Sequence, residues 1–268
     1  MPRKSRKERQ RERLTLVWIV LAVTVSLLIL GLFAYLYLKR DKPLDATTLC
    51  PSGGPLGHYV LLVDKTDPLS FTQRQAFAVM LRELVERRVP EGYLLSVFVL
   101  GEDFKTTAEP LVELCNPGSG AGKSEFTANL KRLRAQYQSR FIEPVIAQAD
   151  VLTASKPANA SPILEMLQLV GINAFRKQAI DGERKLVLVS DMLHNTPQFS
   201  MFNAGATASF SAFAKTDYGR RTQSDLERVD VEIHYLMHAP SLQTKENLQF
   251  WMDYFNQYGA RVVAVRPM

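Results

Sequence analysis

His58-Tyr-Val-Leu-Leu-Val-Asp64 is an apolar run that ends in an acid, and the polar segment Lys65-Thr66-Asp67-Pro68-Leu69-Ser70 follows it directly. Five consecutive apolar residues are typical of a strand that is buried on both faces of a parallel sheet. Open α/β sheets bind ligands in the crevice beyond the carboxyl ends of such strands. The stretch therefore predicts a buried strand over 58–64, followed by a polar loop that faces a crevice.

Strand-like and helix-like segments alternate along the rest of the chain. Apolar runs predict further strands at 93–100, 110–115, 185–190, 231–237 and 261–265, the second of them at an edge. Apolar residues at helical spacing predict helices between Ser70 and Pro90, and at about 125–149, 162–179 and 244–258. Ser70 and Gln73 have capping-box spacing. This order predicts an α/β domain over 58–268, with a doubly wound, mostly parallel, Rossmann-like sheet covered by helices on both faces.

The amino-terminal part is of a different kind, because residues 14–38 contain 25 residues without a charge. A helix of that length crosses a bilayer core of roughly 30 Å. Seven Lys or Arg residues precede the run and three follow it closely, which predicts a cytoplasmic amino terminus. We therefore expect a basic cytoplasmic tail at 1–13, a single-pass signal anchor in the inner membrane at 14–38, a linker at 39–57 and a periplasmic domain. A cleaved signal peptide is the alternative, but the run exceeds a typical apolar h-region and no A-x-A-like site follows it.

The net charge of +6 comes from the tail. Residues 1–42 carry ten basic and three acidic side chains, a balance of +7, so that the remainder is near −1. A domain without excess positive charge is not expected to bind nucleic acid. The tail instead suits anionic lipid headgroups.

Two cysteines, Cys50 and Cys115, both fall on the predicted outer side of the membrane. An oxidising compartment would allow a disulfide between them, whereas two unpaired thiols are the alternative.

The order of elements and the polar strand ends resemble a von Willebrand factor type A domain, whose metal-ion-dependent adhesion site comes from three loops. Asp64 and Thr66 match the Asp and the first hydroxyl of the first loop. Ser161 stands where a hydroxyl residue opens a later helix, and Asp191 matches the Asp after the following strand. Pro68 replaces the second Ser of the first loop, so the motif is incomplete. The resemblance implies a metal site made of Asp64, Thr66, Ser161 and Asp191, in a domain that binds proteins.

Such a set suits Mg²⁺, and also Mn²⁺ or Ca²⁺, because these ions take several oxygen ligands. Asp67 or Ser70 could replace the hydroxyl that Pro68 removes, although Ser70 also has a structural role as a helix N-cap. The alternative interpretation is a metal-free site, in which Asp64 and Asp191 are polar strand ends bonded to loop amides.

The loop Gly118–Ser124 offers an alternative site. Gly122, Lys123 and Ser124 fit the end of the phosphate-binding motif Gly-x-x-x-x-Gly-Lys-Ser/Thr. The leading position, however, is Pro117 instead of Gly. A loop of tight turns is the simpler interpretation.

Three functions remain in competition. The first is a membrane-anchored module that recruits or scaffolds a protein partner in an envelope-associated complex, with a cation at the sheet edge. The second is an enzyme, either nucleotide-binding at Gly118–Ser124 or a metal-dependent hydrolase that uses Asp64 and Asp191 with His194 as a base. The third is a structural envelope component that assembles through its membrane helix. We expect the first, with no enzymatic activity, because the sequence contains no convincing catalytic constellation and no further cofactor site.

Overall fold

The chain forms two compact units, residues 1–43 and residues 44–268, which are described separately below. The structure is a computed structural model, and it describes residues 6–38, 43–124, 128–155, 157–178, 180–202 and 209–268.

The first unit contains one long helix, α1 (Arg6–Leu38). Its segment Thr15–Tyr35 has a mean hydropathy of 2.8 and none of it is buried, so by length and composition this helix could cross a membrane. The hydroxyl of Thr24 donates to the carbonyl oxygen of Val20 at 2.8 Å, which satisfies this polar group within the helix. The predicted apolar helix is therefore present.

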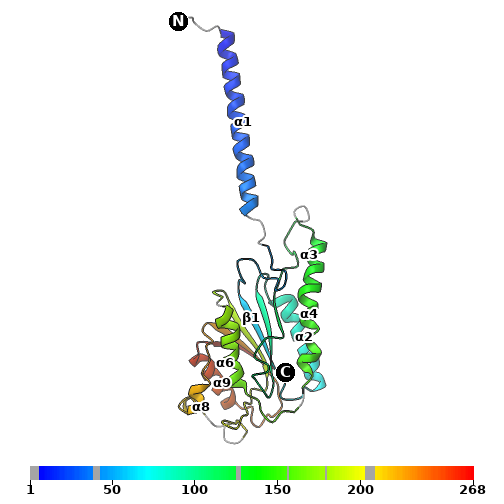
Figure 1. Ribbon diagram of the computed structural model, residues 1–268, viewed down its shortest axis with the longest axis vertical. Helices are drawn as coiled ribbons and strands as arrows, with labels where there is room; N and C mark the ends of the chain where they lie inside the picture. Colours follow the sequence, from blue (N-terminus) through cyan, green and yellow to red (C-terminus); the bar gives the residue numbers. More distant parts are fainter. Residues whose placement is uncertain (1–5, 39–42, 125–127, 156, 179, 203–208) are drawn as a thin grey trace. The chain divides into compact units, whose positions relative to one another are not determined.

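The second unit is built on a six-stranded sheet in the order β3-β2-β1-β4-β5-β6 (Figure 1). The strands are β1 (His58–Asp64), β2 (Leu94–Leu100), β3 (Val112–Cys115), β4 (Arg184–Ser190), β5 (Val229–Tyr235) and β6 (Arg261–Pro267). Neighbouring strands are parallel except for β3, which is antiparallel to β2 at one edge. All seven residues of β1 are buried, as its uninterrupted apolar sequence predicts.

Helices cover both faces of the sheet. The segments of the first face are α2 (Phe71–Glu83), η1 (Leu84–Arg88), η2 (Gln138–Ile142), α4 (Glu143–Ile146) and α5 (Ala149–Thr153), preceded by α3 (Leu130–Tyr137). Those of the second face are α6 (Ile163–Val170), η3 (Gly171–Arg176), α7 (Phe210–Phe213) and α9 (Lys245–Gln257), with α8 (Asp217–Arg221) beside them. Figure 1 shows α2, α3 and α4 on one side of β1, and α6, α8 and α9 on the other.

Alternate residues of each central strand point to opposite faces, and this divides the core into two parts. In β1, Leu61 and Val63 pack toward the face of α2, whereas Val60 and Leu62 pack toward the face of α6 and α9. The predicted doubly wound, mostly parallel α/β sheet is thus confirmed.

The domain begins earlier than the sequence suggested, because most of the expected linker 39–57 belongs to it. Leu49 is 1 % exposed and packs in the core on the α2 face. Leu44 and Pro51 form a β-bridge, and the amide of Cys115 donates to the carbonyl oxygen of Thr48 at 2.8 Å. Its Pro- and Gly-rich composition indicated a linker, but these long-range contacts fix the segment from Leu44 onward to the domain.

The expected helix at 125–149 also differs in the structure. Its start at 125–127 lies outside the described residues, and α3 begins at Leu130. Asn129 is its N-cap, since the Asn129 side chain accepts from the amide of Arg132 at 3.0 Å. The predicted capping box at Ser70 and Gln73 is present as expected.

Candidate cation site at the carboxyl edge of the sheet

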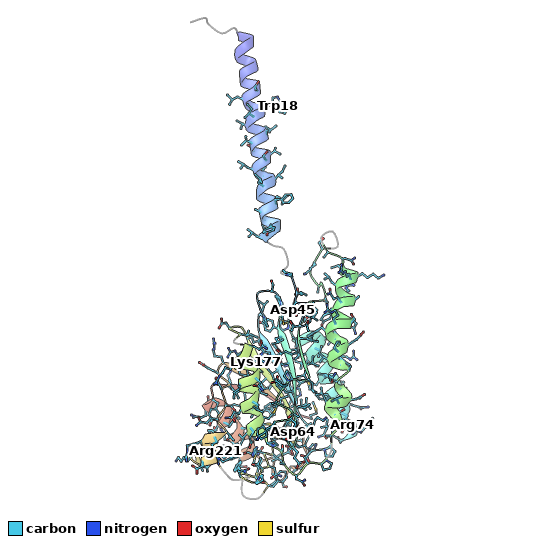
Figure 2. All side chains as sticks on the ribbon, viewed as in Figure 1. Trp18, Asp45, Asp64, Arg74, Lys177 and Arg221 are labelled. Atoms are coloured by element: carbon cyan, nitrogen blue, oxygen red, sulfur yellow. A yellow bond between two sulfur atoms is a disulfide. The ribbon has the colours of Figure 1, made fainter. Side chains whose placement is uncertain are left out.

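The candidate site lies where β1 and β4 end side by side. The chain leaves β1 toward β2 on one side, and later returns as β4 on the other, so the strand order reverses between these two strands. Parallel sheets open a crevice at such a point. The register pairs Val63 with Val189, which sets Asp64 next to Ser190 and just before Asp191. Figure 2 shows Asp64 at the opposite end of the domain from Asp45.

Asp64 is almost fully buried and accepts four hydrogen bonds. Its Oδ1 accepts from the amide and the hydroxyl of Thr66, at 3.0 and 2.6 Å. Its Oδ2 accepts from the hydroxyls of Ser190 at 2.8 Å and Ser161 at 3.4 Å. Burial raises the pKa of Asp64, while the bonds from Thr66 and Ser190 oppose that rise. Three hydroxyls, two from separate loops and one from the last residue of β4, therefore surround this one carboxylate.

The loops that carry Ser161 and Asp191 are tied together. Ser161 and Asn195 form a β-bridge, with backbone N–H···O distances of 2.7 and 3.0 Å. Asp191 accepts at Oδ1 from the amide of Leu193 at 2.9 Å. Burial and the negative charges of Asp64 and Asp67 raise the pKa of Asp191 to about 8.

The backbone next to Asp191 is strained. Met192 has a φ of 56°, a backbone conformation that costs free energy for residues other than glycine. Two side chains of α9 hold it there: Trp251 and Asn247 donate to its carbonyl oxygen at 2.7 and 3.4 Å. The position of Asp191 is thus enforced by packing with a distant helix.

A second group of potential ligands adjoins this carboxylate. Ligand atoms of Asp67, Asp191 and His238 all lie within 4.8 Å of one another. Oδ2 of Asp191 is 4.0 Å from Nδ1 of His238. Asp191 therefore belongs to both sets, one rich in hydroxyls and the other with an imidazole.

The residues present fit a divalent cation. Carboxylate and hydroxyl oxygens are the ligands that such ions take. Burial raises the pKa of both Asp64 and Asp191, so ionisation of these carboxyl groups costs free energy in the folded chain. A bound cation would relieve that cost.

Some sequence-predicted residues join the site and one does not. Asp64, Thr66 and Ser161 meet directly, and Asp191 with Asp67 lies beside them. Ser70 instead caps α2: its hydroxyl accepts from the amide of Gln73, and its amide donates to the Gln73 side chain. A hydroxyl used in this way is a structural group.

Sequence reasoning missed Ser190 and His238. Ser190 precedes Asp191 on a strand that pairs in register with β1, so the pairing of two buried strands was the signal for it. His238 follows β5 and reaches Asp191 only through the path of the loop before α9. The spacing of these residues along the chain does not predict that contact.

His194 is buried and both of its ring nitrogens have partners within the domain, so it does not face the crevice as a base. Its Nδ1 accepts from the amide of Leu164 at 3.4 Å, and its Nε2 lies 3.0 Å from the hydroxyl of Tyr218. Burial lowers its pKa to about 3, which keeps the ring neutral. The side chain thus links α6 to α8.

The loop Gly118–Ser124 lies at the end of the sheet where β2 begins, opposite to the carboxyl ends of the parallel strands. It follows β3, whose last residue Cys115 pairs with Leu94 at the start of β2. Lys123 is 3.8 Å from the carboxylate of Glu91. A phosphate-binding loop follows the carboxyl end of a parallel strand, which is not the position of this loop.

Cys50 and Cys115 form a disulfide, with their Cα atoms 4.8 Å apart. It joins the segment before β1 to the end of the edge strand β3.

No family model matches the chain, and no curated protein matches it. Solved structures to which it is similar include the crystal structure of the SpRpn10 VWA domain, at 9 % identity and a TM-score of 0.38, over 80 % of this chain and 89 % of that one. Another is an aerotolerance-related membrane protein from Bacteroides fragilis NCTC 9343 with multiple mutations to serines, at 10 % identity and a TM-score of 0.33, over 80 % and 92 %. At such scores the fold assignment rests on the strand order and the packing described above.

Proposed function

We propose that this chain is a membrane-anchored interaction module that binds a protein partner at the carboxyl edge of its sheet, through a divalent cation. The observation that carries the proposal is the convergence of three hydroxyls on the buried carboxylate of Asp64, beside the carboxylate of Asp191. A structural role alone would not require two buried acids at one point, since buried carboxylates cost free energy unless they are compensated.

The cation would be held by Asp64 and Asp191, with Thr66, Ser161 and Ser190 as hydroxyl ligands or as donors that orient the carboxylates. A bound ion supplies a strong local positive charge. Protein groups that leave a coordination position open allow an acidic side chain of a partner to complete the shell. The partner is thus expected to present a carboxylate to this crevice.

The amino-terminal helix would tether the domain to the inner membrane, with residues 1–13 in the cytoplasm and the domain in the periplasm. The excess of Lys and Arg before the apolar run supports this orientation. A disulfide between Cys50 and Cys115 is consistent with an oxidising compartment. In that position the domain would recruit a component of an envelope-associated complex.

Co-purification tests the proposal. The full chain is extracted in detergent and captured in buffer with Mg²⁺ and Mn²⁺ or with EDTA, and bound proteins are compared by mass spectrometry. We expect a partner that is retained with the cations and lost with EDTA, and also lost from the Asp64→Asn and Asp191→Asn variants.

Asp230→Asn is the matched control, because Asp230 lies at the other end of the sheet, where it pairs with Arg261 at 2.9 Å. This variant should keep the partner. A partner that every variant retains in EDTA would contradict the proposal. One retained by α1 alone, after deletion of residues 44–268, would favour assembly through the membrane helix.

A further inference from the structure

One ring nitrogen of His238, Nδ1, is buried and has no hydrogen-bond partner among the residues that the structure describes. Oδ2 of Asp191 lies 4.0 Å from this Nδ1. That distance is too long for a hydrogen bond. Buried polar atoms are satisfied in most proteins, so an exception beside two carboxylates calls for an explanation.

The hydrogen-bond network determines which nitrogen of His238 carries the proton. The side-chain amide of Gln73 is oriented by two contacts: its Oε1 accepts from the amide of Ser70 at 2.9 Å, and its Nε2 donates to the carbonyl oxygen of Met268 at 3.3 Å. The same Oε1 lies 3.3 Å from Nε2 of His238. An amide oxygen can only accept, so Nε2 of His238 is the donor in this contact and Nδ1 is the nitrogen that can bind a metal ion.

Three electron-rich groups therefore converge on one point. Nδ1 of His238 faces Asp191, and ligand atoms of Asp67, Asp191 and His238 lie within 4.8 Å of one another. Ligand atoms that share an ion at about 2.1 Å are separated by roughly 3–4 Å, so only a small contraction is needed. In addition, Nε2 of His238 donates to Gln73, and the ring nitrogen that does not bind the metal usually makes such a hydrogen bond in metal-binding histidines.

We propose that Asp67, Asp191 and His238 bind a divalent transition metal of the zinc and manganese class, in preference to Mg²⁺ or Ca²⁺. The proposal rests on the proposed function, because Asp191 is a ligand in both sets, and it specifies the class of the metal that Asp191 holds. Imidazole nitrogen suits first-row transition metals, whereas Mg²⁺ and Ca²⁺ take oxygen ligands. Asp67 and His238 thereby supply the donors that Pro68, at the position of a hydroxyl, does not.

Pulsed electron paramagnetic resonance of bound Mn²⁺ tests the ligation directly. The full chain in detergent micelles, freed of metal with EDTA, is titrated with Mn²⁺. The wild-type spectrum should contain modulation from a coordinated ¹⁴N. The His238→Gln variant should lose that modulation and bind Mn²⁺ and Zn²⁺ at least tenfold more weakly, while its affinity for Mg²⁺ changes less than twofold.

His234→Gln is the matched control. His234 lies four residues earlier and pairs with Glu232 at 2.9 Å, away from Asp191. This variant should retain the ¹⁴N modulation and the wild-type affinities. Asp67→Asn should weaken Mn²⁺ binding without loss of the modulation in whatever complex remains. The wild-type spectrum decides the assignment even if the His238 variant does not fold.

The outcomes separate this inference from the proposed function. Bound Mn²⁺ without ¹⁴N modulation, with wild-type affinity in His238→Gln and loss in Asp191→Asn, would overturn the role of His238 but keep a cation site. Failure of the wild type to bind either Mn²⁺ or Zn²⁺, while it binds Mg²⁺, would likewise overturn only the metal class. Absence of binding for all three ions would overturn both this inference and the cation in the proposed function.

Discussion

The hydroxyl of Ser190 donates a hydrogen bond to Oδ2 of Asp64 at 2.8 Å, although 126 residues separate the two along the chain. The bond joins the ends of β1 and β4, the two strands between which the sheet reverses its order. Among the residues that the structure describes, Oδ2 has one other donor, Ser161, at the longer distance of 3.4 Å. Ser190 is therefore the stronger of the two hydrogen-bond donors to this oxygen.

Ser190→Ala should destabilise the domain by about 1–3 kcal/mol, because it leaves a buried carboxylate oxygen with only its weaker donor. Urea unfolding of the full chain in detergent measures the loss. Ser139→Ala serves as the control, since Ser139 is exposed and bonds only within its own helical segment; it should change the free energy of unfolding by less than about 0.5 kcal/mol. Equal effects of the two changes would contradict the role given to Ser190.

Divalent cations should stabilise the wild-type domain and not Asp64→Ala. A ligand at 100 times its dissociation constant stabilises the folded state by about 2.7 kcal/mol, which raises the Tm by several degrees. Melts of the full chain with Mn²⁺, Mg²⁺ or EDTA measure this. Asp230→Ala should respond like the wild type, because Asp230 lies at the other end of the sheet. The prediction fails if Asp64→Ala gains as much stability from the cations as the wild type does.

In EDTA, the contribution of Asp191 to the stability of the domain should decrease as the pH rises from about 4 to about 8. Burial and the nearby carboxylates raise the pKa of Asp191 from 3.8, the ordinary value of an Asp, to about 8, so the folded chain keeps this proton to a higher pH than the unfolded chain does. This residue's contribution to the free energy of unfolding is thus complete below pH 4. It is lost as the pH rises toward 8, at up to about 1.4 kcal/mol per pH unit.

Asp191→Asn should remove that contribution, since an amide does not titrate. The difference between the slopes of wild type and variant, from unfolding curves at pH 5 to 8, isolates the contribution. Added Mn²⁺ should also remove the contribution of Asp191 in the wild type, because a bound cation favours the ionised carboxylate. Identical slopes for wild type and Asp191→Asn in EDTA would contradict a raised pKa at this position.

Removal of the disulfide should destabilise the domain by about 4 kcal/mol, because Cys50 and Cys115 close a loop with a sequence separation of 65 residues. The double variant Cys50→Ser and Cys115→Ser, compared with wild type by urea unfolding, measures the change. A reducing agent should weaken the wild type and leave the double variant unaffected. If both cysteines of protein isolated from membranes reacted with an alkylating agent without prior reduction, this result would contradict the disulfide.

An alkaline phosphatase fused after Met268 should be active in cells, because that enzyme needs an oxidising compartment for its disulfides. The orientation follows from the basic residues before the apolar run. A fluorescent protein that folds only in the cytoplasm, fused at the same point, should be dark. The reverse pattern would place the domain in the cytoplasm and remove the argument for an oxidising environment.

Much of the fold could be predicted because local patterns specify it. Uninterrupted apolar runs gave the buried strands β1 and β4, and alternation with amphipathic segments gave the layers on both faces. The segment 44–57 could not be assigned in this way, since its contacts are with residues distant in the sequence, such as Cys115. Composition reports the local preference of a segment but not the surface on which it packs.

The amino-acid order alone specified the apolar helix, the α/β alternation and the acids at the ends of two strands, because burial and backbone periodicity leave their mark within a few neighbouring residues. The tertiary structure decided that Ser190 bonds to Asp64, that Ser70 is a cap, and that His238 approaches Asp191. These relations depend on strand register and on the paths of loops. Both are set by packing between residues that lie far apart in the chain.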